Sequence, residues 1–304
     1  MTSIRKSDDQ SVALLDSPRS VLAMVVCIVI GEGSLISMPF VVGGIVERYD
    51  LAEGTAGIVT SLQFITMGLA SIIILNIVHR IDRRRWVLVA GVLILLGHGL
   101  AIVSSNWTLF LIGRVLTGLG EGTALSIGNA TAAGSARPQK AFSILAFTMA
   151  ITAITIYLFM PSLAREIGAV AVFYVLTGLA ALALPFLMAM PRGRLHSTDS
   201  SSQTEKVVWW PFPRLLVGIA CMFIGINALW AYSERIGFSI GLDIDTIVSA
   251  FLATVIFSSL GPVLANFTEK KWGYRTPILI VTLVAGTANF VLATASFKLV
   301  FFAG

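Results

Sequence analysis

The stretch WTLFLIGRVLTGLGEGTALSIGNATA, from Trp107 to Ala132, carries one arginine and one glutamate in an otherwise uncharged run. About 20 predominantly apolar residues suffice for a helix to cross ~30 Å of hydrocarbon, so the stretch predicts a membrane span. Arg114, Gly118 and Gly122 recur every four residues, and Gly120 lies between the two glycines. Residues four apart share a helix face, where small side chains let another helix approach closely. The stretch therefore predicts a span that combines a charge with a packing seam.

Apolar runs of similar length recur along the whole chain. With 304 residues, 56% hydrophobic and 12% charged, the chain has half the charge of an average soluble domain, which is about 25% charged. The mean hydropathy of +0.89 agrees. We predict an all-α polytopic membrane protein with spans over residues 21–45, 55–77, 86–104, 107–132, 141–164, 169–190, 215–236, 246–266 and 276–296, and the start of a tenth at Leu299.

The basic residues fall in short clusters between the apolar runs, so the net charge of +5 does not indicate a nucleic-acid-binding face. Positive charge in short loops favours the cytoplasmic side. Most of the 21 Lys and Arg lie on one side if the N-terminus is cytoplasmic. We therefore expect an integral protein of the cytoplasmic (inner) membrane, with the lipid bilayer and not nucleic acid as its partner.

The chain divides around one long polar segment. Residues 1–190 predict a six-helix bundle, residues 191–214 a cytoplasmic linker containing HSTDSSSQTEK, and residues 215–304 a second bundle. The loop HRIDRRRW at 79–86 is echoed by TEKKWGYR at 268–275, again after the second span of its half. Parallel repeats of this kind are typical of two-bundle transporters. On that plan the second bundle is partial, with about 9–10 spans in all, and we expect a fragment or a truncated gene product.

Two motifs carry a family resemblance. RVLTGLGEG fits the pattern Arg-x-x-x-Gly-x-Gly through Arg114, Gly118 and Gly120. The loop at 75–85 keeps the basic half of Gly-x-x-x-Asp-Arg-x-Gly-x-Arg-Arg but has Leu, His and Asp at the Gly, Asp and second Gly positions. In these motifs the chain resembles the major facilitator superfamily. The resemblance implies a two-bundle fold and secondary transport of a small molecule by alternating access.

Charges inside the predicted spans are the candidates for coupling transport to protons. Glu32, Arg114 and Glu121 lie well inside spans, where a charge needs a partner. Counting 1.5 Å per residue places Glu32 and Arg114 at similar depths, so they are expected to be counter-ions. A purely structural ion pair is the alternative. Glu121 either extends a proton path or stays protonated and bonds a neighbouring backbone group, and His98 is either functional or a satisfied helix contact.

Neutral polar side chains complete the predicted cavity. Gln63, Asn227 and Trp230 have amide or aromatic groups suited to a partly polar organic solute. Trp230 can equally be an anchor at the membrane interface.

The loop after the second span is a candidate cytoplasmic gate. Its charged members are Arg80, Asp82, Arg84 and Arg85. They can hold the inward gate shut by pairing across the bundle interface, or they can serve topology alone.

Enzyme signatures are missing from the sequence. It has no His/Cys spacing typical of a metal site and no GxxxxGK[ST] phosphate loop, so we expect no cofactor, no metal and no catalysis. The expected function is secondary transport of a small organic solute, coupled to protons. The alternative is a truncated, transport-inactive membrane protein that acts only as a binding or assembly partner.

Overall fold

The computed structural model describes residues 17–193, 211–259, 275–294 and 301. The chain forms two compact units, Met1–Ser197 and Thr198–Gly304, and each is described by itself. The N-terminal tail, most of the predicted linker, nearly all of TEKKWGYR and the tenth span at Leu299 lie outside the described residues.

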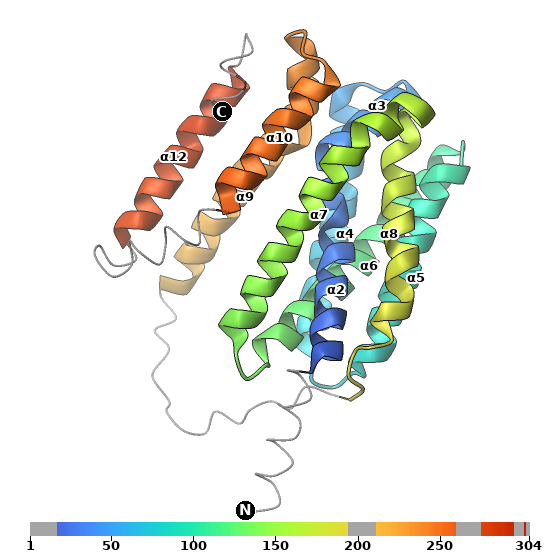
Figure 1. The fold of residues 1–304 in the computed structure, drawn as a ribbon, viewed down its shortest axis with the longest axis vertical. Coiled ribbons are helices and arrows are strands. Elements are labelled where there is room, and N and C mark those ends of the chain that lie inside the picture. The colour runs from blue at the N-terminus through green and yellow to red at the C-terminus, as the bar shows by residue number, and fades with distance from the viewer. Residues whose placement is uncertain (1–16, 194–210, 260–274, 295–300, 302–304) are drawn as a thin grey trace, which may run out of the picture. The chain divides into compact units, whose positions relative to one another are not determined.

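The first unit is a bundle of helices (Figure 1). Its elements are α2 (Pro18–Ile36), α3 (Met38–Tyr49), α4 (Glu53–Ile77), α5 (Arg83–Val103), α6 (Trp107–Ala133), α7 (Pro138–Ile167), the short 3-10 turn η1 (Gly168–Val170) and α8 (Ala171–Leu187). The second unit contains α9 (Pro211–Ser239), α10 (Ile244–Ser259) and α12 (Arg275–Ala293). Every described element is a helix, which confirms the predicted all-α class.

Five of the described helices are long and apolar enough to cross a membrane, judged by length and composition. They are Pro18–Ile36, Glu53–Ile77, Arg83–Val103, Pro138–Ile167 and Leu216–Ser239.

The first predicted span, 21–45, is divided into α2 and α3 at Ser37. Pro39 lies in the first turn of α3 and has no backbone N–H to donate, which favours an interruption of the helix at this point. Tyr157 of α7 donates its hydroxyl to the Ile36 carbonyl at the break, over 2.9 Å. The break is thus held by a neighbouring helix.

Helix α6 packs against α2, α4 and α5, and its glycines set how closely they approach. A β-carbon at Gly118 would meet the Gln63 carbonyl of α4, and one at Gly120 would lie 2.7 Å from the Ala90 carbonyl of α5. Gly122 likewise faces a carbonyl of α4. The predicted packing glycines therefore occupy two contacts, one with α4 and one with α5.

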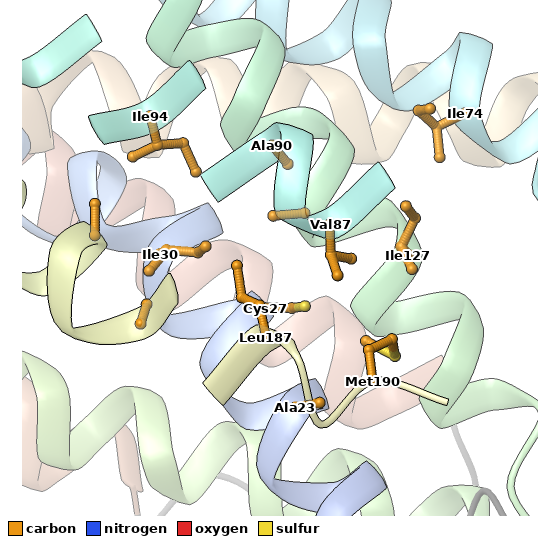
Figure 2. Packing of buried hydrophobic residues seen from close by; sticks show 13 residues of the cluster. Ala23, Cys27, Ile30, Ile74, Val87, Ala90, Ile94, Ile127, Leu187 and Met190 are labelled. Carbon is orange, nitrogen blue, oxygen red and sulfur yellow. The ribbon is translucent and has the colours of Figure 1, made fainter. Parts of the chain in front are cut away.

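The apolar core lies where α2, α5, α6 and α8 meet, as Figure 2 shows. Cys27, Val87, Ile127 and Leu187 are all fully buried there. Since lipid is as apolar as these side chains, the contacts stabilise the bundle mainly through close van der Waals packing. Small residues such as Ala90 keep the helices close enough for it.

Alanine at Gly118 is expected to destabilise the bundle. Its β-carbon would overlap the Gln63 carbonyl and the Thr66 hydroxyl, and overpacking costs about 1–3 kcal/mol. The melting temperature of the detergent-purified protein should fall by several degrees, at about 2–4 °C per kcal/mol. Gly68→Ala in α4 is the matched control, because no atom lies within 4 Å of its added carbon. Equal melting temperatures for Gly118→Ala and Gly68→Ala would contradict close packing of α6 against α4 at Gly118.

Candidate functional site

Arg114 lies fully buried in α6 and contacts side chains of two other helices. Its Nη1 donates to Oε1 of Gln63 on α4 over 3.0 Å, and its Nη2 lies 3.2 Å from Nδ1 of His98 on α5. Arginine can only donate, so Nδ1 of His98 must accept. The neutral His98 ring therefore carries its hydrogen on Nε2.

Glu121, two turns along α6 from Arg114, is the acidic member of the same cluster. Only 1% of the residue is exposed. Its Oε2 accepts from Nε2 of Gln63 over 2.8 Å, and its Oε1 lies 3.8 Å from Nε2 of His98. Gln63 and His98 thus form two parallel bridges between the guanidinium and the carboxylate. We call Gln63, His98, Arg114 and Glu121 the bridged cluster.

Aromatic rings cover the guanidinium on its other sides. The Cζ of Arg114 lies 5.4 Å from the ring centroid of Phe110 and 5.0 Å from that of Phe173 on α8. Ring faces attract a cation, and the attraction grows when water is excluded. Tyr49 and Trp107 extend the stack, with centroids 4.8 Å and 5.7 Å from Phe110. The guanidinium of Arg114 therefore contacts aromatic rings as well as the polar side chains of Gln63 and His98.

The bridged cluster is not fully hydrogen-bonded. Among the described residues, Nε of Arg114, Oε1 of Glu121 and the hydroxyl of Thr117 are buried without a hydrogen-bond partner. The 3.8 Å gap between His98 and Glu121 is too long for a hydrogen bond. Unsatisfied buried polar atoms are costly, so an arrangement that pairs these three atoms would lower the free energy of the bundle.

The predicted Glu32–Arg114 ion pair is not among the contacts of the described residues, so the pairing stays a prediction. Within the described ranges, no carboxylate lies within 4.0 Å of Arg114, and Glu32 has no ion-pair partner. Helix α2 packs on α6 so that a β-carbon at Gly31 would lie 3.2 Å from the Glu121 carbonyl. Glu32 is therefore level with Glu121, and Arg114 lies a further seven residues, about 10 Å, along α6.

The three predicted cavity residues occupy different settings. Gln63 is fully buried and uses its amide to bridge Arg114 and Glu121, so it is a member of the cluster rather than an exposed lining residue. Asn227 donates to the Phe223 carbonyl of its own helix.

Trp230 lines a pocket of about 160 Å³ within the second unit. Its ring centroid lies 4.9 Å from that of Phe251 on α10. Ser233 of α9 and Asn289 of α12 add polar groups to the same pocket. Only a small part of a solute, flat and largely apolar with one or two polar groups, would fit this space.

The sequence leaves His98 as either a functional group or a satisfied helix contact. One signal is visible in the sequence: His98 follows Gly97, and a glycine inside a span lets another helix approach closely. In the structure, a β-carbon at Gly97 would lie 2.6 Å from the Gly113 carbonyl of α6, and the imidazole of His98 reaches Arg114 on that helix.

The loop between α4 and α5 is tied to the end of α8. Asp82 begins α5 as its N-cap, with Oδ1 accepting from the Arg85 backbone N–H over 3.1 Å and Oδ2 accepting from the Gly193 N–H over 3.4 Å. Arg83 is buried, and its Nε donates to the Gly193 carbonyl over 3.3 Å. The predicted gate residues Arg80 and Arg85 are exposed and Arg84 is half-buried, so their gating role stays a prediction.

Because Asp82 is the N-cap residue of α5, we expect its charge to stabilise the fold. Partial burial raises the pKa of Asp82, but the backbone N–H groups of Arg85 and Gly193 outweigh it, and the pKa lies below its ordinary value. Its charge therefore stabilises the fold above the ordinary pKa of about 4, and this stabilisation is lost as the pH falls through the lowered folded value.

Asp82→Ala should cost about 0.5–2 kcal/mol, whereas Asp82→Asn, which keeps a capping oxygen, should cost less. Melting curves at pH 7 and at pH 3.5 test this. The difference between wild type and Asp82→Asn should shrink at the lower pH. A difference that grows on acidification would contradict the assigned cap.

No group of three or more His, Cys, Asp or Glu side chains suited to a metal is found among the described residues. The side chains of the bridged cluster can themselves bind a proton and pair charges.

Comparisons with known proteins bear on this fold. The family described as the Major Facilitator Superfamily matches residues 22–304. The chain is similar to the crystal structure of a D-xylose-proton symporter, with a TM-score of 0.61 and 17% identity over 93% of this chain and 77% of that one. It is also similar to the in meso crystal structure of the POT family transporter PepTSo, with a TM-score of 0.45 and 14% identity over 93% of this chain and 58% of that one. No curated protein matches the sequence. At these identities the first likeness shows the fold alone, and the second is too weak to support an argument.

Proposed function

The chain belongs to the Major Facilitator Superfamily and is therefore a membrane transport protein, and from this premise we propose that it moves a small organic solute by alternating access with proton coupling. We place it in the cytoplasmic membrane with its N-terminus inside, as the distribution of Lys and Arg favours. Transport is preferred to an assembly role because the family match covers both units of the chain.

The observation that carries proton coupling is the pair of bridges between Arg114 and Glu121. Both residues are almost fully buried, and each bridge contacts both of them. A change of protonation at the carboxyl group must therefore alter the contacts of the guanidinium. This link between a proton site and a cation is what a coupled transporter requires.

The His98 bridge supplies a specific sequence of events. If Oε1 of Glu121 takes a proton, Nε2 of His98, at 3.8 Å, can accept from its O–H. Nε2 can accept only when it holds no hydrogen, so the incoming proton binds Nδ1 while the Nε2 hydrogen passes to Oε1. Nδ1–H would then face Nη2 of Arg114, donor against donor, and the 3.2 Å contact would be lost. Protonation of Glu121 thereby frees one side of Arg114.

Glu32 has a separate role in this proposal. It is half-buried, and it follows Gly31, where α2 lies against the Glu121 backbone. We assign Glu32 to proton access and Glu121 to proton storage. Partial exposure suits the first role, and the hydrogen bonds that lead from Glu121 through Gln63 to Arg114 suit the second.

The solute is proposed to contact Trp230 in the pocket of the second unit. An indole ring and a nearby amide can hold a partly polar organic molecule. The D-xylose-proton symporter is named for a sugar and protons, but the fold likeness does not assign its substrate to this chain.

Flux measurements in proteoliposomes test the proposed function. A thermal-shift screen of sugars, amino acids and organic ions first identifies solutes that raise the melting temperature. These solutes are then added outside liposomes that contain the full chain and a trapped pH dye, with and without a pH gradient. Solute-dependent proton movement is expected. Flux that ignores the gradient would leave transport without proton coupling, and absence of flux for every stabilising solute would favour the assembly role.

A further inference from the structure

A pocket at one end of the first unit is separate from the bridged cluster. It has a volume of about 360 Å³ and lies between the beginnings of α2 and α7. Val21 and Met24 of α2 and Ile144 of α7 supply apolar walls, and Arg137 and Lys140 supply two cations. The pocket therefore combines an apolar interior with positive charge at the helix ends.

The two cations are available to a ligand. Both side chains are exposed, and within the described ranges neither has a carboxylate within 4.0 Å. Arg137 is the N-cap residue of α7 and makes no side-chain capping bond. The uncapped start of α7 adds the positive end of a helix dipole to the same rim. All three features favour an anion.

The position of the pocket identifies the kind of anion. Helices α2 and α7 are both long and apolar enough to span a membrane, and both begin at the pocket. The cations thus lie near the membrane surface and the apolar walls lie toward its interior. A free phosphate would gain nothing from Val21, Met24 and Ile144, whereas a phospholipid offers a phosphate and the first part of an acyl chain together.

We propose that this pocket binds an anionic phospholipid, with Arg137 and Lys140 on the headgroup phosphate and the walls of α2 and α7 along the acyl chain. A lipid bound in this pocket would contact both α2 and α7 and so stabilise their packing. The site is independent of the proposed proton coupling, since it shares no residue with the bridged cluster.

Binding of phosphatidylglycerol to the purified full chain in detergent tests the proposal, with native mass spectrometry as the measurement. Phosphatidylcholine with the same acyl chains, glycerol 3-phosphate and inorganic phosphate are the comparison probes. Wild type should retain phosphatidylglycerol in preference to phosphatidylcholine. A basic residue near a membrane surface contributes about fivefold in affinity, so Arg137→Gln/Lys140→Gln should lose about 25-fold.

The matched control is Arg19→Gln/Arg192→Gln, which removes two exposed cations that do not line the pocket. It should bind phosphatidylglycerol as wild type does. The charge-conserving variant Arg137→Lys/Lys140→Arg should also bind, which separates lost charge from lost folding.

Three results would overturn the proposal. They are unchanged binding by the Gln variant, equal retention of phosphatidylcholine, and displacement of phosphatidylglycerol by an equal concentration of glycerol 3-phosphate or inorganic phosphate. The last result would mark the pocket as a site for free anions. None of these results depends on whether transport is coupled to protons.

Discussion

Arg114→Met is expected to abolish transport and to lower the stability of the first unit strongly. Methionine keeps much of the side-chain volume but removes the bonds to Gln63 and His98 and the contacts with the Phe110 and Phe173 rings. Glu121 is then a buried carboxylate without a nearby cation. Removing one member of a buried charge pair costs roughly 3–5 kcal/mol.

The double variant Arg114→Met/Glu121→Gln separates the charge effect from the lost contacts. It removes the orphaned charge, so it should be more stable than Arg114→Met alone. Arg114→Lys should fold but transport poorly, because a single ammonium cannot reproduce the planar fork or its stacking. Arg165→Met, at an exposed position of α7, is the control for loss of a cation. Equal melting temperatures for the single and double variants would show that Arg114 and Glu121 do not compensate each other.

The helices were predictable because length and apolar composition determine them locally. The prediction of a span over 55–77 corresponds to α4 at Glu53–Ile77, and that over 86–104 to α5 at Arg83–Val103. The break at Ser37 was missed, although Pro39 is visible in the sequence. Proline is tolerated inside membrane spans when neighbouring groups satisfy the backbone, so its presence alone does not predict an interruption.

The partners of Arg114 could not be predicted in the same way. Depth was counted from the ends of the spans, but the relative heights of two helices depend on where their small residues let them meet. Because Gly31 packs against the Glu121 backbone, Glu32 is level with Glu121 and lies two turns of α6 away from Arg114. Gly97 lies against Gly113 and brings His98 into reach instead. Such contacts depend on both helices at once, so the Gly97–His98 pair indicates a close approach without showing which helix is the partner.

The loop between α4 and α5 shows a related limit. Its arginines are conspicuous in the sequence, yet the one that is buried and bonded is Arg83, next to the predicted gate residues. Its partner is the backbone of Gly193, and a backbone carbonyl carries no sequence signature. The composition of the loop shows that arginines gather there, but it does not show which arginine makes the hydrogen bond to Gly193.

Glu121→Gln is expected to uncouple transport from the pH gradient. Glutamine keeps an oxygen to accept from Nε2 of Gln63, but it cannot take up a proton near neutral pH. His98 would then keep its hydrogen on Nε2 and its contact with Arg114 at every pH of the assay. Proteoliposomes should still exchange a solute identified by the thermal-shift screen, with a rate that no longer responds to an imposed pH difference.

Glu32→Gln is the matched comparison, since it makes the same change at a half-buried position level with Glu121. If Glu32 gives protons access and Glu121 stores them, this variant should slow gradient-driven uptake while keeping its dependence on pH. Loss of all pH dependence in Glu32→Gln, with normal dependence in Glu121→Gln, would reverse the two assignments. If uptake by both variants depends on the pH gradient as it does in the wild type, neither carboxyl group is the coupling site. The two variants therefore decide which acid responds to the proton, because only the one whose protonation changes the contacts of Arg114 can link the gradient to the solute.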